Sequence, residues 1–299
     1  MIFNGYYTGF ADEAGADLET QIRATRALGW SCLEARNIGG RNIHDLSDAE
    51  FDQVCGRLDE AGLRVNCFGS AIANWAKAIT DPFDSSLAEA RRAIPRMQRL
   101  GTQLVRIMSF AVIKDRPPDD QMAEERFRRV RELQQMFTDA GLTPLHENCM
   151  NYGGMGYTYT LRLLEAVPGL RLVFDTGNPV FSDDRSKAAP YPKQSAFAFY
   201  AQVRDFVSYI HIKDGIWNAA EGRTHYTFPG EGHGDVPEIL ADLIGRGYAG
   251  GISIEPHLAV VHHDSTVRSE AAVRFDNYVE YGRRLMALVE RLPQRTPTA

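Results

Sequence analysis

Short apolar runs alternate with longer amphipathic runs along the whole chain. Each apolar run has the length of a β-strand, and each longer run spaces its apolar residues as one face of a helix does. The pattern predicts strands at Tyr6–Phe10, Ser31–Arg36, Arg64–Gly69, Gln103–Met108, Thr143–Asn148, Leu170–Asp175, Val207–Lys213 and Gly251–Glu255. It predicts helices at Asp17–Leu28, Ser47–Ala61, Ser85–Leu100, Asp120–Ala140, Thr158–Ala166, Gln194–Asp205, Val236–Arg246 and Thr266–Arg291.

Strict alternation of eight strands and eight helices predicts an α/β fold with a parallel sheet that closes into a (β/α)₈ TIM barrel. We expect one catalytic domain over residues 1–292 and a disordered tail over 293–299. No G-x-G-x-x-G turn follows a predicted strand, which disfavours a dinucleotide-binding fold. The longest irregular stretches are Asn178–Lys193 and Asp214–Gly234. Both follow strands, where barrel enzymes build their sites, and Tyr152–Gly156 is expected to be a flexible loop over the site.

Charge and composition narrow the functional class. The net charge is −6, from 39 acidic and 33 basic residues, and no basic stripe indicates a nucleic-acid partner. No apolar run approaches the roughly 20 residues that a membrane span needs. We expect no signal peptide, since the first residues lack a basic segment before an apolar one. Four cysteines without a C-x-x-C pair fit a reducing cytoplasm.

Four consecutive predicted strands each end in a side chain that binds hard metal ions: Glu147, Asp175, His211 and Glu255. The intervals are 28, 36 and 44 residues, about one βα unit each, so the four side chains should converge at one mouth of the barrel. Three carboxylates and one imidazole favour Mn²⁺ or Mg²⁺, and they also allow Co²⁺ or Zn²⁺. Such an ion would polarise a carbonyl group and stabilise an enediolate.

The alternative is a salt-bridged cluster without a metal ion. Three crowded carboxylates then need cations, and the sequence offers only Lys213 and Arg106 close by. If the metal is bound, Glu147 and Glu255 are the catalytic candidates, because one can remove a proton beside a carbonyl and the other can return it.

Several motifs resemble the sugar phosphate isomerase/epimerase group, which has a xylose-isomerase-like barrel. They are HEN at 146–148, FDTGN at 174–178, HIKD at 211–214, GEGHGDV at 230–236 and IEPH at 254–257. The segments Gly9–Glu13 and Leu33–Asn37 are also similar, so the resemblance covers nearly the whole chain. The group includes ketose 3-epimerases, hydroxypyruvate isomerases, inosose dehydratases and C-glycoside deglycosidases that act on 3-keto sugars.

The resemblance implies that Glu147, Asp175, His211 and Glu255 bind Mn²⁺ and that the two glutamates exchange the proton. Ketose 3-epimerases of the group place a histidine where this chain has Asn178. They also place an arginine soon after the metal-binding histidine, whereas this chain has Trp217 there and its nearest arginine is Arg223. Asn178, Trp217, Arg223 and His257 are therefore the candidate substrate-binding residues. C-glycoside-cleaving members place a catalytic histidine near His146, which makes His146 a third catalytic candidate.

These observations predict an enzyme with a sugar or keto-sugar as its small-molecule partner. The first hypothesis is a metal-dependent isomerase or epimerase that works through an enediolate. The second is a lyase, either a 3-keto C-glycoside deglycosidase with a small partner subunit or an enzyme like inosose dehydratase. The third is a binding barrel without catalysis. The long last helix is compatible with a homo-oligomer contact.

Overall fold

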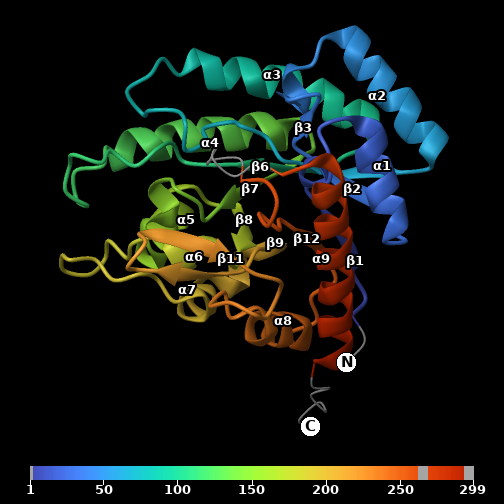
Figure 1. Ribbon diagram of the computed structural model, residues 1–299. Helices are drawn as coiled ribbons and strands as arrows, with labels where there is room; N and C mark the ends of the chain where they lie inside the picture. The colour runs from blue at the N-terminus through green and yellow to red at the C-terminus, as the bar shows by residue number, and fades with distance from the viewer. Residues whose placement is uncertain (1–2, 262–268, 293–299) are drawn as a thin grey trace.

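The computed structural model describes residues 3–261 and 269–292. Eight parallel strands form one sheet in the order β1-β12-β9-β8-β7-β6-β5-β2. A parallel bridge between Phe10 and Glu34 joins β1 to β2 beyond the ends of the ladder, so the sheet closes on itself. The helices lie around the outside of these strands (Figure 1). The predicted (β/α)₈ barrel is confirmed.

The barrel strands match the predicted ones to within one or two residues at each end. They are β1 (Tyr6–Gly9), β2 (Cys32–Ala35), β5 (Arg64–Phe68), β6 (Leu104–Ile107), β7 (Thr143–Glu147), β8 (Arg171–Asp175), β9 (Val207–Ile212) and β12 (Gly251–Ile254). Two short antiparallel hairpins that the pattern missed follow β2 and β9. They are β3 (Asn37–Ile38) with β4 (Arg41–Asn42), and β10 (Gly215–Asn218) with β11 (Arg223–Tyr226).

The helices of the outer layer are α1 (Leu18–Ala27), α2 (Asp48–Ala61), α3 (Asp84–Leu100), α4 (Ala123–Asp139), α5 (Tyr157–Ala166), α7 (Ala196–Val203), α8 (Val236–Gly245) and α9 (Ala271–Arg291). Ser47 caps α2 in a capping box with Glu50, and the left-handed Gly62 ends the helix. The start predicted for the last helix, Thr266, and the tail 293–299 lie outside the described residues.

Side chains alternate between the two faces of each barrel strand, and this alternation separates two cores. A small core inside the barrel contains Cys67, Leu145, Val173 and Tyr209. A much larger core lies between the strands and the helices. Because residues two apart share a face, Glu147 lies on the inner face with Leu145, Asp175 with Val173, and His211 with Tyr209.

Short helical turns replace loop at several places near the carboxyl ends of the strands. They are η1 (Ala11–Glu13), η2 (Ile43–Asp45), η3 (Tyr152–Met155), α6 (Asn178–Phe181) and, before β9, η4 (Arg204–Phe206). The flexible loop expected at Tyr152–Gly156 is wrong, since the four residues of η3 are buried. Thr160 donates a hydrogen bond to the Gly153 carbonyl at 2.6 Å, and a side chain at Gly153 would meet His146.

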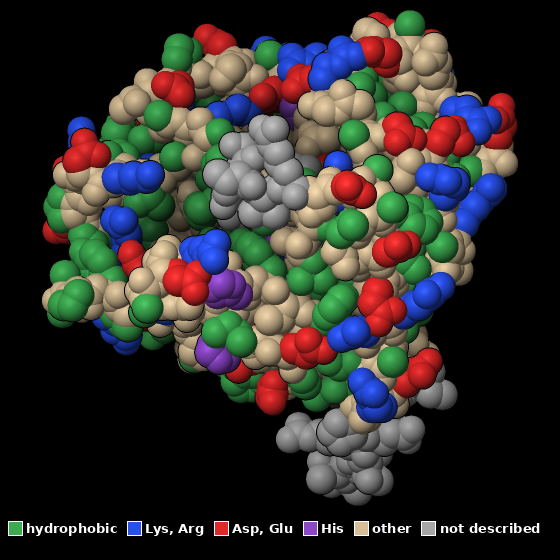
Figure 2. All heavy atoms as spheres, in the orientation of Figure 1, with side chains coloured by type: hydrophobic (Ala, Val, Ile, Leu, Met, Phe, Trp, Pro, Cys, Tyr) green, Lys and Arg blue, Asp and Glu red, His purple; other side chains and the backbone are tan. Residues whose placement is uncertain are grey.

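The surface carries acidic and basic side chains of mixed sign. On the face that Figure 2 shows, red and blue side chains are interspersed and form no broad field of one sign. In the described ranges, no helix has both the length and the apolar character needed to cross a bilayer. All four cysteines are buried and free of disulfides.

Candidate functional site

Four buried side chains meet at the carboxyl ends of neighbouring strands. Glu147 ends β7, Asp175 ends β8, His211 lies near the end of β9, and Glu255 follows β12. Each offers a ligand atom, and these atoms all lie within 4.8 Å of one another. The four predicted ligands therefore converge at one mouth, as the spacing along the chain requires.

His211 lies between two carboxylates. Its Nδ1 is 3.1 Å from Glu147 Oε1, and its Nε2 is 3.1 Å from Glu34 Oε2. Glu34 comes from β2 on the far side of the barrel and also accepts hydrogen bonds from Tyr209 at 2.9 Å and Ser253 at 2.6 Å. Glu34 thus fixes the imidazole with Nδ1 facing the cluster, in the manner of an outer carboxylate that orients a metal-binding histidine.

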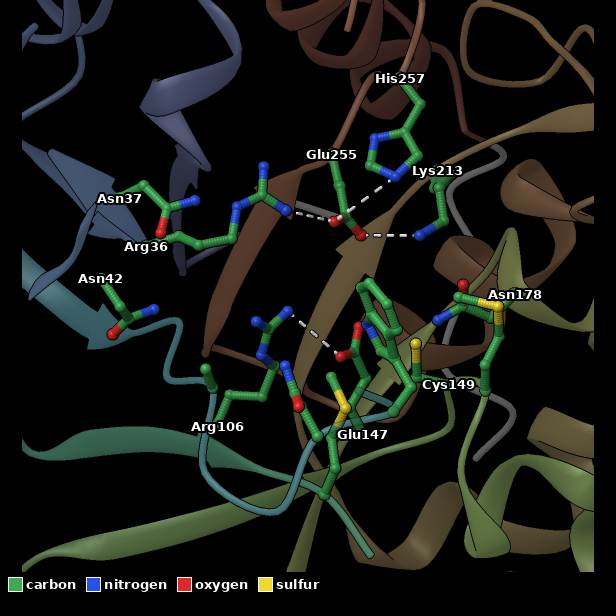
Figure 3. A pocket seen from close by; sticks show the side chains of 15 residues that line it. Arg36, Asn37, Asn42, Arg106, Glu147, Cys149, Asn178, Lys213, Glu255 and His257 are labelled. Atoms are coloured by element: carbon green, nitrogen blue, oxygen red, sulfur yellow. Dashed lines mark hydrogen bonds and ion pairs between the residues drawn. The ribbon is translucent and has the colours of Figure 1, made fainter. Parts of the chain in front are cut away.

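Three cations surround the carboxylates (Figure 3). Lys213 and Arg36 reach Glu255 from opposite sides, each at 2.7 Å, and Lys213 also lies 3.1 Å from Asp175. Arg106 lies 3.2 Å from Glu147. Sequence reasoning found Lys213 and Arg106 but missed Arg36, whose guanidinium also binds Asp12 and Glu13.

The buried charges at the mouth do not balance. Within the described part of the chain, six buried carboxylates face the three cations Arg36, Arg106 and Lys213, an excess of three negative charges when the imidazoles are neutral. The carboxylates are Asp12, Glu13, Glu34, Glu147, Asp175 and Glu255. A salt-bridged cluster alone can reduce this excess only by binding protons, whereas a divalent cation offsets two of the charges directly.

The pKa values of Asp175 and His211 reflect this excess of negative charge. Burial, together with the charges of Glu255 and Glu147, raises the pKa of Asp175 to about 7 against the opposing charge of Lys213. Burial lowers the pKa of His211, but Glu34 and Glu147 outweigh it and raise the pKa to about 10. His211 is therefore an imidazolium without a metal ion, and binding of an ion at Nδ1 must release its proton.

The donor set fits a divalent ion. Asp175 Oδ1 accepts from the backbone N–H groups of Gly177 and Asn178 at 2.9 and 2.6 Å. Its Oδ2 forms no hydrogen bond within the described residues, where its ion-pair contact is the Lys213 ammonium at 3.1 Å. A buried carboxylate oxygen without a hydrogen bond, beside two further carboxylates and an imidazole, is the arrangement expected of a ligand to a hard cation.

A polar pocket of about 200 Å³ opens directly onto the cluster and is lined by Glu147, Glu255 and all three cations. Asn178 and His257, two of the four predicted substrate-binding residues, line it as well. The Asn178 Nδ2 group is buried and has no hydrogen-bond partner in the described part of the chain. The His257 ring is held by Glu13, whose Oε1 lies 2.9 Å from Nδ1. Both residues are placed to contact a small ligand.

The other predicted site residues lie elsewhere. His146 is on the outer face of β7, where its Nε2 lies 3.0 Å from the Ser109 hydroxyl, and burial lowers its pKa to about 4. Trp217 is on the β10–β11 hairpin under the Lys193 ammonium, and the exposed Arg223 binds Glu221. None of the three lines the pocket, so their placement gives no support to the predicted roles.

Asp214 explains two of the sequence motifs together. Its carboxylate accepts four backbone N–H groups, from Gly215, Gly230, Gly232 and Gly234, at 2.8 to 3.1 Å. A Cβ at Gly232 or Gly234 would lie within 2.8 Å of Asp214 Oδ1. The HIKD and GEGHGDV motifs therefore form one folded unit, which anchors the long loop after β9 beside Lys213.

Comparisons with known proteins agree with this geometry. In solved structures the fold is similar to that of a Mycobacterium smegmatis xylose isomerase-like TIM barrel protein in complex with magnesium (TM-score 0.66, 18% identity, 96% of this chain and 98% of the other). It is also similar to the probable 3-DHS dehydratase AsbF of Bacillus anthracis (0.65, 14%, 94% and 98%) and to the D-allulose 3-epimerase of a Methylomonas species (0.63, 16%, 95% and 98%). At these identities the likeness shows the fold alone.

No curated protein matches the chain in sequence. The family model for the xylose isomerase-like TIM barrel matches residues 22–275, which include the four clustered side chains and the strands that carry them. The chain belongs to the xylose isomerase-like TIM barrel family.

Proposed function

We propose that the protein is a divalent-metal-dependent isomerase or epimerase of a sugar or keto-sugar. The observation that carries the proposal is the pair of carboxylates, Glu147 and Glu255, that line one polar pocket from strands separated by β8 and β9. The family and the epimerase among the structural neighbours support the same reaction class.

The ion would be held by Glu147, Asp175, His211 and Glu255. Three carboxylates and one imidazole are a donor set that favours Mn²⁺ or Mg²⁺. The magnesium complex of one neighbour supports a divalent ion at such a site. When bound, the ion supplies a Lewis acid that makes the C–H bond beside a substrate carbonyl more acidic.

Glu147 is the better base of the pair. Burial raises the pKa of Glu147, but Arg106 and His211 lower it below the usual range. Burial also raises the pKa of Glu255, yet Lys213, His257 and Arg36 lower it well below the usual range. Glu147 therefore removes the proton, and Glu255 passes a proton from the Lys213 ammonium, 2.7 Å away, to the opposite face of the substrate, after which exchange with solvent restores both groups. The free amide of Asn178 donates a hydrogen bond to a substrate oxygen.

The test is deuterium exchange from D₂O in the Mn²⁺-loaded protein over a panel of keto-sugars. We expect deuterium at the carbon beside the carbonyl, and a loss of about a hundredfold or more in the exchange rate for Glu147→Gln. Glu238→Gln on the exposed side of α8 is the matched control and should exchange at the wild-type rate. No exchange with any member of the panel, or full exchange by Glu147→Gln, contradicts the proposal.

A dehydratase is the second candidate. Elimination begins with the same proton removal and then expels a hydroxide, which needs a proton donor or cation at the leaving oxygen. The buried Lys213 ammonium lines the pocket and supplies that charge, and AsbF among the neighbours is described as a dehydratase. Loss of water from the substrate, detected by mass spectrometry and abolished in Lys213→Met, distinguishes this reaction from isomerisation.

A further inference from the structure

A second and larger cavity adjoins the polar pocket. Its volume is about 400 Å³, twice that of the pocket at the metal cluster. The two cavities share Trp75, Cys149 and Met150 as a common wall. This second cavity, here called the distal chamber, lies between the segments that follow β6, β7 and β8, and none of the four clustered carboxylate and imidazole residues lines it.

Hydrogen bonds join the segments that line the distal chamber. Ala111 and Asn151 form an antiparallel bridge across it. Arg185 donates its backbone N–H to the Met155 carbonyl at 2.9 Å, and the Gln194 side chain donates to the Gly154 carbonyl at 2.8 Å. These bonds join the segments after β6, β7 and β8 to one another, so the chamber is preformed for a ligand.

The lining of the distal chamber differs in kind from that of the polar pocket. Trp75, Val112, Met155 and Phe181 give it an apolar interior. Its polar groups are largely engaged, since Asn151 accepts from Ser109 and donates to the Glu147 carbonyl. A second sugar ring would find few donors and acceptors here. A flat apolar ring would be covered by aromatic and thioether side chains.

The charge of the distal chamber is positive. Lys114 and Arg185 line it, and within the described residues neither has a carboxylate at ion-pair distance. The acidic group in the lining, Asp183, is already paired with Lys193 at 2.7 Å. Two cations without acidic partners favour an anionic substituent on the ligand.

We infer that the distal chamber binds the second part of a two-part substrate, a flat apolar ring that carries an anionic group, while the sugar part occupies the polar pocket. Trp75, Cys149 and Met150 line both cavities, so the two cavities lie close enough for one molecule to occupy them together. This inference rests on the proposed function for the sugar part only. The distal chamber itself can be tested without a sugar.

The first experiment titrates the Mn²⁺-loaded protein with naphthalene-2-carboxylate and its neutral amide. A ligand of this size should bind with a Kd of about 1 mM or below. Val112→Trp fills the distal chamber from one wall and Ser182→Trp from another, and each should weaken binding at least about tenfold. Val273→Trp, on the exposed side of α9, is the control. The inference is overturned if the wild type shows no saturable binding, or if both filled variants bind the probe as tightly as the wild type does.

Charge reversal tests the anionic group. Lys114→Glu should weaken the carboxylate about threefold and leave the amide unchanged. Arg116→Glu makes the same change in net charge two residues away, outside the distal chamber, and should affect neither probe. If both variants weaken the carboxylate equally, the effect is long-range and the anionic substituent is excluded.

The last experiment tests whether the two cavities serve one molecule. In the wild type, 2-naphthyl β-D-glucopyranoside should bind at least about tenfold more tightly than methyl β-D-glucopyranoside. In Val112→Trp the two glucosides should bind with equal affinity. Equal binding in the wild type overturns the two-part substrate. Val112→Trp should still catalyse deuterium exchange into free keto-sugars, because that activity does not need the distal chamber. This measurement therefore tests the proposed function independently of the distal chamber.

Discussion

Two sets of buried cations in this barrel are held in opposite ways. Arg126 of α4 is fully buried and meets no carboxylate among the described residues. Instead it donates to the backbone carbonyls of Gln121, Ser109, Phe110 and Ala111 at 2.6 to 3.0 Å. Arg36, Arg106 and Lys213 at the barrel mouth each reach a carboxylate instead.

This difference distinguishes a cation that stabilises the fold from cations that surround the proposed ligand site. Burial lowers the pKa of Arg126 to about 10, yet its hydrogen bonds are satisfied by carbonyls that need a donor in any case. The mouth has more carboxylates than cations and keeps a carboxylate oxygen of Asp175 and an amide of Asn178 without hydrogen bonds among the described residues. These two groups without hydrogen bonds are those that the proposed metal ion and substrate would complete.

The largest effect that this comparison predicts is on metal affinity. Asp175→Asn keeps an oxygen for the backbone N–H groups of Gly177 and Asn178 but removes a charged ligand. We expect Mn²⁺ affinity, measured by calorimetry, to fall by more than about a hundredfold while the unfolding midpoint stays the same or rises. Asp139→Asn, at an exposed position of α4, is the matched control. A large loss of stability without loss of metal would remove the distinction.

Arg126→Met should do the reverse. It leaves up to four carbonyls without their donor, at a cost of about 3 kcal/mol in the free energy of unfolding. Denaturant titration measures this cost, with Arg131→Met on the same helix as an exposed control. Metal affinity of the folded variant should remain within about twofold of the wild type. A metal defect without destabilisation would show that Arg126 belongs to the site.

Glu34→Gln tests the hidden partner of His211. The amide keeps the shape of Glu34 but loses the charge that orients the imidazole from behind. We expect a loss of about 10- to 100-fold in Mn²⁺ affinity, as for other outer partners of metal ligands. Tyr209→Phe removes one donor to Glu34 and should lose less. Unchanged affinity in Glu34→Gln would mean that the pairing has no role in metal binding.

The last effect is a pH dependence of the stability of the metal-free protein. The pKa of Asp175 is raised to about 7 in the fold, against about 4 in an unfolded chain. The folded state therefore binds the extra proton between these values, and stability falls as pH rises from 4 to 7 by at most about 1.4 kcal/mol per pH unit. Denaturant midpoints of wild type and Asp175→Asn should diverge over this range. A constant difference would contradict the raised pKa.

The barrel and the convergence of the four predicted ligands could be predicted because both depend on a unit that repeats locally. Each strand and its polar last residue lie within one βα unit, so the order along the chain reproduces the order around the mouth. The regular alternation of β7 also sets the direction of His146, which faces the helices because Leu145 and Glu147 face inward.

The partners of the ligands were hidden by distance along the chain. Arg36 and Glu255 are 219 positions apart, and Glu34 and His211 are 177 positions apart. Strand pattern places each at the mouth but does not say which strands face each other across it. The hairpins β3–β4 and β10–β11 were missed for a different reason, since each strand is only two to four residues long. Their residues are also mostly polar, so they lack the apolar pattern by which barrel strands of the same length were recognised.

The closing seam of the barrel has a consequence for how the protein comes into being. The Phe10 ring lies at the bridge to Glu34 and contacts the guanidinium groups of Arg36 and Arg106 at 4.2 and 5.0 Å. Arg36 in turn holds Glu255, which follows the last strand. A nascent chain that has emerged only as far as α8 lacks Glu255, the fourth predicted ligand, and also β12, the strand that joins β9 to β1. Retention of the proposed metal therefore reports completed synthesis and closure of the ring.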